Sequence, residues 1–345
     1  MRWAAESGMP SGHEGASVKP GRLMGGSGAG PGKPKILYIA GWGRSGTTIV
    51  GGILGHAPGF FHGGEILYLA KRGREGNYLC GCGEPLRECK VWNEVLTHVG
   101  RHDGSDTLDL LAEIQDQVAR TRRLPILLGL GRFGITARKE ERLVRLLTEL
   151  YSKIQETTQA RWIVDSSKSP AYGRLLSMSP DLDVYVLHLI RDPRATGVSW
   201  RKWKYDAAAR GYLDRYGRVK NVTLWMVWNA FIEAFWNRRE TRARYHRLRY
   251  ETFAARPREA IQAVFDFVGS PEAQVPWKEG DEIEMSTSHT VGGNPVRMRT
   301  GTIRIATDSE WRNQVTGLDR VLVSGLAWPL LLRYGYPLWV GGRDR

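Results

Sequence analysis

Residues 35–52 constrain the fold more strongly than any other stretch of the chain. They read KILYIAGWGRSGTTIVGG, which is a short apolar run, a glycine-rich turn, and then small and β-branched residues. The run from Lys35 to Ala40 predicts a buried strand, and a helix is expected to begin near Ser45. From Gly41 to Thr48 the spacing is G-x-x-x-x-G-T-T, which is that of a nucleotide-binding P-loop with threonine in the place of its lysine.

This loop is a predicted anion-binding site. Its glycines let successive backbone N–H groups turn toward a phosphate, and the helix that follows adds its positive end. The lysine that is absent here normally reaches the β- and γ-phosphates of a nucleoside triphosphate. The loop, with Arg44 at its tip, therefore favours an anion with a different arrangement of charge.

Length and charge narrow the class of protein. At 345 residues the chain has room for one large domain or two small ones, and 41% of its residues are hydrophobic, which is enough for a core. The formal net charge of +14 favours polyanionic partners, namely nucleic acid, an anionic lipid surface, an acidic glycan or a multiply phosphorylated small molecule. Charge alone does not discriminate among these partners.

The two ends of the chain differ in composition from the rest. The first 33 residues are rich in Gly, Ser, Ala and Pro and lack an apolar stretch of signal-peptide length. We therefore expect residues 1–33 to be disordered, residues 34–340 to form one domain, and the protein to be cytoplasmic. Residues 321–340 are apolar, but Pro329 and Arg333 interrupt them, and no run approaches the roughly 20 residues of a spanning helix. They predict a buried C-terminal helix and no integral membrane segment.

The three cysteines lie in one short stretch, CGCGEPLREC, as Cys80, Cys82 and Cys89. Their spacing fits no common zinc template, because a fourth ligand would have to come from elsewhere, for instance His98 or His102. We interpret the stretch as a loop with reduced or occasionally disulfide-paired thiols, and we predict no bound metal.

Three further strands are predicted, and a chemically active side chain follows each of them. The first lies around Phe60 and Phe61, the second spans Arg161 to Val164, and the third spans Val184 to Ile190. Because ligands bind at the carboxyl ends of strands in open α/β sheets, the side chains that follow these strands are candidates for one site. They are Glu65, Lys168 in a predicted turn, and Arg191, with Ser199 about two turns into a helix that Asp192 and Pro193 are expected to begin.

Helical spacing of apolar residues predicts helices that cover the sheet. They span residues 107–120, 136–158, 222–244 and 257–268, and a short strand is expected at residues 245–250. Residues 289–312 are basic and rich in glycine, which predicts a long functional loop. The expected fold class is α/β, a P-loop-type three-layer fold with a central, mainly parallel sheet flanked by helices.

With these motifs in place, the chain resembles the sulfotransferases that use 3′-phosphoadenosine 5′-phosphosulfate (PAPS), most nearly the carbohydrate and tyrosylprotein branches and their bacterial relatives. The resemblance covers roughly residues 35–335. The family's 5′-phosphosulfate loop has the form R-S-G-T-T, and its 3′-phosphate motif is an arginine at a strand end with a serine eight residues later. The matching residues are Arg44, Ser45, Gly46, Thr47 and Thr48 for the loop, and Arg191 and Ser199 for the second motif.

Four further matches concern the adenine, the closing loop and the reacting groups. Tyr250, in R-Y-E, resembles the family tyrosine that lies against the adenine. The run Arg299, Thr300, Gly301 resembles a late arginine-x-glycine that closes over the 3′-phosphate. Glu65, in G-G-E, resembles the general base of the tyrosylprotein enzymes, and Lys168 resembles their lysine aimed at the bridging oxygen.

The resemblance implies a sulfotransferase domain over residues 34–340 that moves a sulfuryl group from PAPS to an acceptor hydroxyl and releases adenosine 3′,5′-bisphosphate. Arg44 and Lys168 would supply positive charge, and Glu65 would be the base, with His62 as its nearest competitor. A sulfuryl group is less charged than a phosphoryl group, so no divalent metal is expected. The sequence leaves open the oligomeric state and the acceptor, which is a sugar, a phenol, a tyrosine or a small metabolite.

Two other functions explain part of the sequence. A P-loop kinase-like phosphotransferase would share the fold, but the loop lacks the lysine, and Asp165 is the one strand-end candidate for binding Mg²⁺. A basic glycan- or nucleic-acid-binding module would account for the net charge of +14 and the 13 tryptophans. Such a module interleaves basic and aromatic residues on one surface, whereas these tryptophans fall at core-like helical spacings. We therefore expect a small-molecule or glycan acceptor and no nucleic acid.

Overall fold

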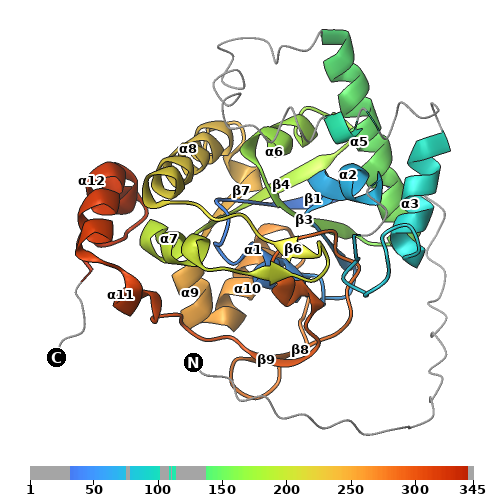
Figure 1. Ribbon diagram of the computed structural model, residues 1–345. Helices are drawn as coiled ribbons and strands as arrows, with labels where there is room; N and C mark the ends of the chain where they lie inside the picture. The colour runs from blue at the N-terminus through green and yellow to red at the C-terminus, as the bar shows by residue number, and fades with distance from the viewer. Residues whose placement is uncertain (1–31, 75–77, 102–108, 110, 114–136, 341–345) are drawn as a thin grey trace, which may run out of the picture. The chain divides into compact units, whose positions relative to one another are not determined.

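The protein is described by a computed structural model, shown in Figure 1, that covers residues 32–74, 78–101, 109, 111–113 and 137–340. Nearly all of the predicted disordered segment, and most of the predicted helix at residues 107–120, lie outside these ranges. Residues from Lys33 onward form one compact unit.

A five-stranded sheet lies at the centre of this unit, with the strand order β2-β3-β1-β4-β7 and every neighbouring pair parallel. The central strand, β1, is buried along almost its whole length, as the continuous apolar run predicts for a parallel sheet covered on both faces. The bounds of the strands are β1 Lys35–Ala40, β2 Phe60–Gly64, β3 Trp162–Lys168, β4 Asp183–Ile190 and β7 Tyr245–Arg249.

Helices cover both faces of the sheet, so the expected α/β three-layer fold is confirmed (Figure 1). One apolar core packs α2, α3, α5, α6 and α8 against the sheet, and the other packs α1, α9 and α10. The helices are α1 Thr47–Leu54, α2 Leu69–Arg74, α3 Lys90–Arg101, α5 Ala137–Thr158, α6 Pro170–Leu176, α7 Pro193–Arg201, α8 Arg218–Trp236, α9 Tyr250–Ala255, α10 Pro257–Phe267, α11 Trp311–Gln314 and α12 Gly317–Arg333.

Short elements complete the fold. The one-turn helices are η1 Ile66–Tyr68, η4 Arg242–Arg244 and η5 Pro295–Met298, and the two small hairpins pair β5 Tyr205–Asp206 with β6 Gly211–Tyr212 and β8 Glu282–Met285 with β9 Gly301–Arg304. Within residues 289–312, where the sequence predicts one long loop, the structure contains the turn η5 and the strand β9. The run at β9 is too short to show a strand period of its own, and it pairs antiparallel with β8.

Two other element boundaries differ from the prediction. Strand β3 continues through the sequence DSSK to Lys168, because Ala40 at the end of β1 pairs with Lys168 across an irregularity in the register. These residues therefore belong to the strand and not to a turn. Helix α8 spans Arg218–Trp236 and not residues 222–244, since the polar run after Trp236 has no apolar face to bury and contains the separate turn η4.

The C-terminal helix corrects a third prediction. Helix α12 passes through Pro329 without ending, and Val323, Ala327 and Leu331 bury one of its faces against α8. The other face carries exposed apolar side chains, among them Val321 and Trp328, so the helix is buried on one side only. No helix in the described part of the chain is long and apolar enough to cross a membrane.

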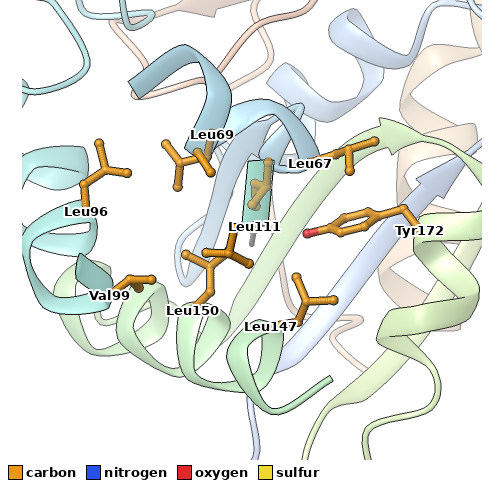
Figure 2. A pocket seen from close by; sticks show the side chains of 10 residues that line it. Leu67, Leu69, Leu96, Val99, Leu111, Leu147, Leu150 and Tyr172 are labelled. Carbon is orange, nitrogen blue, oxygen red and sulfur yellow. The ribbon is translucent and has the colours of Figure 1, made fainter. Parts of the chain in front are cut away.

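A small pocket of about 20 Å³ lies in the core, and Figure 2 shows the side chains that line it. Its walls are mainly leucine side chains from η1, α2, α3 and α5, and its polar member, the Tyr172 hydroxyl, hydrogen bonds with the Tyr151 hydroxyl. A space of this size holds about one water molecule. We therefore regard it as a packing feature of the core and not as a ligand site.

The turn after β1 depends on glycine at position 41. Gly41 has φ +149°, and a Cβ atom there would lie 2.2 Å from the carbonyl oxygen of Leu189 in β4. Gly41→Ala should lower the free energy of unfolding by about 1–3 kcal/mol, because backbone must move to relieve the overlap. Gly325→Ala, in α12 with open space around it, is the matched control, and equal denaturant midpoints for the two variants would contradict this account.

Candidate active site

A cavity of about 780 Å³ lies at the carboxyl ends of β1, β3 and β4. Its volume falls within the range of about 300–1,000 Å³ that is typical of small-molecule sites. Its walls include the loop after β1, the ends of β3 and β4, helix α7, and the segment around η5. Parallel strands bring these segments together because their carboxyl ends share one edge of the sheet.

The loop after β1 supplies polar groups that have no partner in the described structure. Gly46, with φ +91°, caps α1, and the residues that follow it begin the helix. The hydroxyl oxygen of Ser45 and the Nε atom of Arg44 are buried and form no hydrogen bond. Buried polar atoms normally have partners, and a helix N-terminus attracts anions. The loop therefore combines donors that lack partners with a helix N-terminus, a combination that suits an anion.

Arg191, at the end of β4, forms a second cationic group in the same cavity. Its NH1 group donates to the carbonyl oxygen of Arg44 (3.1 Å), and its NH2 group lies 2.6 Å from the Asp308 carboxylate. Its guanidinium carbon lies 4.4 Å from the ring centroid of Tyr250. Asp192 caps α7 by accepting from the backbone N–H of Arg194, as predicted, and α7 brings Ser199 to the wall of the cavity.

Tyr250 contacts both Arg191 and the loop after β1. A Cβ atom at Gly46 would approach the Tyr250 ring to 2.5 Å, so the loop and the ring are in direct contact only because residue 46 is glycine. Tyr250 therefore contacts both the loop and Arg191 in the wall of the cavity.

Lys204 is a site residue that the sequence analysis missed. It lines the cavity, and its Nζ donates to the hydroxyl oxygen of Ser199 (3.4 Å). Burial, together with the positive charges of Arg44, Lys202 and Arg191, lowers the pKa of Lys204 to about 8. Lys204 follows the end of α7 in an irregular segment, where the sequence has no strand-end or helix signal that would mark it.

Glu65 and Lys168 form a buried ion pair at the ends of β2 and β3. The Lys168 Nζ donates to Glu65 Oε1, and the Arg72 guanidinium lies 3.7 Å from Glu65 Oε2. Burial alone would raise the pKa of Glu65, but the charges of Lys168 and Arg72 and the hydrogen bond from Lys168 outweigh it and lower that pKa. Glu65 is therefore ionised at neutral pH. Arg72, in α2, has no sequence signal that would assign it to the site.

His62 lies outside the lining of this cavity. Its Nε2 is 3.1 Å from the Ser166 hydroxyl oxygen, and its ring packs against Gly51 of α1, where a Cβ atom would come within 2.5 Å of it. Burial lowers the pKa of His62 to about 3. His62 does not line the cavity that holds Glu65, so the geometry favours Glu65 of the two candidate bases.

The late segment contributes different residues from those that the sequence indicated. Arg299 lines the cavity at its exposed rim, whereas Thr300 and Gly301 lie outside the lining. Gly293 and Asn294 line it instead, and the backbone N–H of Asn294 donates to the Thr48 hydroxyl oxygen (3.2 Å). This hydrogen bond ties the late segment to the first loop, and Thr47 and Thr48 both line the cavity as expected.

Aromatic side chains form one wall of the cavity. The rings of Trp200 and Tyr216 stack with centroids 4.3 Å apart, and the Arg44 guanidinium carbon lies 4.7 Å from the Trp200 centroid. Trp228 also lines the cavity, although the spacing in α8 indicated a core residue. The prediction holds for Trp225 and Trp236, which are buried in the core.

Asp165, the candidate Mg²⁺ ligand of the kinase alternative, lies in the core. Its carboxylate accepts from the Tyr151 hydroxyl and from the backbone N–H and hydroxyl of Ser167, and burial raises its pKa to about 6. Asp165 is fully buried and does not line the cavity.

The cysteines have a histidine neighbour that the sequence analysis did not anticipate. Ligand atoms of Cys80, Cys82, Cys89 and His289 all lie within 4.8 Å of one another. His98, which we considered as a fourth ligand, instead lies 3.6 Å from the Glu149 carboxylate, and His102 lies outside the described residues.

Comparison with known proteins adds a family match. The sequence profile described as the sulfotransferase family matches residues 35–274. No match was found among curated proteins. Among solved structures, the chain is similar to the sulfotransferase domain from the curacin biosynthetic pathway, with 17% identity and a TM-score of 0.49 over 90% of this chain and 100% of that one. It is also similar to sulfotransferase STF9 from Mycobacterium avium, with 14% identity and a TM-score of 0.45 over 91% of this chain and 79% of that one.

The lowered pKa of Lys204 predicts a pH-dependent affinity for a phosphate-bearing ligand. A bound anion favours the charged amine, so affinity should be full below the pKa of about 8 and should fall by up to about tenfold per pH unit above it. Calorimetry with adenosine 3′,5′-bisphosphate between about pH 7 and pH 9.5 measures this. Lys204→Arg should remove the decline, since arginine stays charged. The same decline in that variant would rule out Lys204 as its source.

Proposed function

This chain belongs to the sulfotransferase family and is a sulfotransferase, and we propose that it transfers the sulfuryl group of PAPS to the hydroxyl group of an acceptor. One observation carries the choice of donor: residues 44 and 46–48 of the loop line the same cavity as Arg191 and Ser199, and the Tyr250 ring contacts both Gly46 and Arg191. PAPS carries a phosphosulfate at its 5′ end and a phosphate at its 3′ position, so it needs two separate anion sites with room for a nucleoside between them.

The residues of each anion site fit the group assigned to it. Arg44 lines the cavity beside the N-terminus of α1 and offers to the 5′-phosphosulfate an Nε donor that has no partner among the described residues. The neighbouring Ser45 hydroxyl is fully buried and does not line the cavity. Arg191, Ser199 and Lys204 would hold the 3′-phosphate, and the charge of that phosphate would offset the repulsion that lowers the pKa of Lys204. Charge-assisted hydrogen bonds of this kind are stronger than neutral ones.

The proposed transfer is an in-line displacement at sulfur. The acceptor oxygen forms a bond to sulfur while the bond from sulfur to the bridging oxygen breaks, and the electron pair of that bond remains on the 5′-phosphate of adenosine 3′,5′-bisphosphate. Glu65 takes the proton of the acceptor hydroxyl. Lys168 and Arg44 stabilise the negative charge that develops on the bridging and sulfuryl oxygens.

The ion pair between Lys168 and Glu65 suggests how the base is prepared. The charges of Lys168 and Arg72 keep the pKa of Glu65 below its ordinary value, which makes Glu65 ionised but a weak base. When Lys168 turns to the bridging oxygen, Glu65 loses its nearest positive charge and its pKa rises toward the working pH, where a general base is most effective. Donor binding and base activation would thus be coupled through one side chain.

The acceptor would lie between Glu65 and the aromatic wall. Tyr68, Tyr216 and Trp228 line that part of the cavity together with Arg72. These side chains favour an acceptor with an apolar or aromatic ring beside its hydroxyl group, such as a phenol or a sugar.

The donor assignment predicts a preference between two nucleotides. Calorimetry should show binding of adenosine 3′,5′-bisphosphate without a divalent cation and much weaker binding of ATP with Mg²⁺. Arg191→Ala should weaken bisphosphate binding by about ten- to a hundredfold, because a charge-assisted hydrogen bond contributes roughly 1.5–3 kcal/mol. Arg256→Ala, an exposed arginine paired with Glu259, is the control. Unchanged affinity in a folded Arg191→Ala variant, or tighter binding of ATP, would refute the donor assignment.

The base assignment predicts a loss of turnover without a loss of donor binding. Glu65→Gln preserves the shape of the side chain, so bisphosphate affinity should stay within about threefold, while turnover with saturating PAPS should fall by about 10²–10⁴. Release of the bisphosphate can be followed chromatographically with a panel of phenols and sugars. His62→Gln is the comparison, and it should lose much less turnover. A Glu65→Gln variant with near wild-type turnover excludes Glu65 as the base.

A further inference from the structure

The cluster of three cysteines and one histidine has the dimensions of a tetrahedral metal site. His289 Nδ1 lies 3.2 Å from the sulfur of Cys89 and 3.9 Å from that of Cys80, and all four ligand atoms, including the Cys82 sulfur, lie within 4.8 Å of one another. Four ligands at about 2.0–2.3 Å from one tetrahedral zinc ion are roughly 3.4–3.8 Å apart. Small movements of the side chains would therefore close the cluster around an ion.

The backbone brings these ligands together from distant parts of the chain. Cys80 and Cys82 lie in a tight turn in which the N–H of Gly83 donates to the carbonyl oxygen of Cys80 (3.0 Å), and Cys89 directly precedes α3. His289 lies about 200 residues later, in residues 286–299, which we call the clasp segment. At Gly81 a Cβ atom would lie 2.6 Å from the carbonyl oxygen of Ser288, so only glycine lets the turn and the clasp segment approach this closely.

We propose that Cys80, Cys82, Cys89 and the Nδ1 atom of His289 bind one Zn²⁺ ion. Three sulfur ligands and one imidazole are a ligand set of structural zinc sites, and soft thiolates select against Mg²⁺ and Ca²⁺. Each thiol would release its proton on binding, which leaves the site with one net negative charge. Because the protein supplies all four ligands, the site has no open position for a substrate, and its role is structural.

The surroundings of the cluster match this charge and geometry. The buried Arg297 guanidinium donates to the carbonyl oxygens of Leu79 and Thr290, which are the residues next to Cys80 and His289 in the sequence. It would offset the negative charge of the zinc site. The indole N–H of Trp92 donates to the carbonyl oxygen of His289 (2.8 Å) and fixes the backbone of that ligand. Such outer contacts orient metal ligands.

The clasp segment connects this site to the cavity. The N–H of Val291 donates to the carbonyl oxygen of Gly63, and the N–H of Glu65 donates to that of Val291. Two residues beyond Val291, the segment enters the cavity wall at Gly293 and Asn294. A zinc ion on His289 would therefore hold in place both the backbone of Glu65 and one wall of the cavity.

The metal content of the 345-residue chain tests the proposal directly, and this test does not depend on which sulfuryl donor the protein uses. Protein produced with zinc in the medium and dialysed against a weak chelator should contain about one zinc ion per chain by elemental mass spectrometry. His289→Ala and Cys82→Ser should lower this content at least about fivefold, since a site with three ligands binds more weakly. His98→Ala, whose histidine pairs with Glu149 outside the cluster, should retain the wild-type content.

Two further measurements do not depend on the variants folding. Wild-type protein stripped of zinc and loaded with Co²⁺ should show the visible spectrum of tetrahedral thiolate coordination. Removing the metal should increase amide hydrogen exchange in residues 286–299 and lower the melting temperature, with both reversed by Zn²⁺ but not by Mg²⁺. Zinc-free wild-type protein, a disulfide between Cys80 and Cys89, or equal zinc loss in His98→Ala and His289→Ala would each overturn the proposal.

Discussion

Positive charge gathered at the carboxyl edge of the parallel sheet is the constraint on which the proposed chemistry depends. Arg44 and Arg191 follow β1 and β4, and α7 leads to Lys204 beside them. Their mutual repulsion shows in the pKa of Lys204, which burial and these neighbours lower to about 8. Asp308 offsets part of this charge on Arg191, but the side chain of Asp308 is 42% exposed and free to be displaced. A doubly anionic ligand relieves the repulsion, and a neutral one does not. The cluster of positive charge therefore favours the doubly anionic donor that we propose.

A second constraint is the close packing of backbone around the site. Gly46 allows the Tyr250 ring to contact the loop, and Gly64, with φ +75°, allows Val291 of the clasp segment to pair beside Glu65. A Cβ atom at Gly64 would lie 2.8 Å from the Val291 nitrogen. The Glu65 carboxylate thus lies between the sheet and a segment that returns from the C-terminal third of the chain. The position of Glu65 depends on both the sheet and the clasp segment. Because the clasp segment also carries His289 of the cysteine cluster and lines the cavity at Gly293, it connects the proposed base with the cluster and with the proposed donor site.

The sequence predicts the local parts of this arrangement well and the distant contacts poorly. The strands and the cap at Asp192 follow from apolar runs and single residues, and the fold class follows from their order, so these predictions are confirmed. Lys204 and Arg72 reach the cavity only through tertiary packing, and His289 meets the cysteines across about 200 residues. No local spacing encodes such contacts. The extension of β3 was missed for a related reason, since its polar end is stabilised by pairing with β1 and not by its own pattern.

The central claim is that one cavity holds both ends of PAPS and that Lys168 passes from Glu65 to the donor. A crystal structure with adenosine 3′,5′-bisphosphate bound tests it most directly. The account predicts the 5′-phosphate within hydrogen-bonding distance of the loop of residues 44–48, the 3′-phosphate on Arg191 and Ser199, and the Lys168 amine turned from the Glu65 carboxylate to the 5′-phosphate. A nucleotide bound outside this cavity, bound in the reverse orientation, or bound with Lys168 still paired to Glu65 would contradict it.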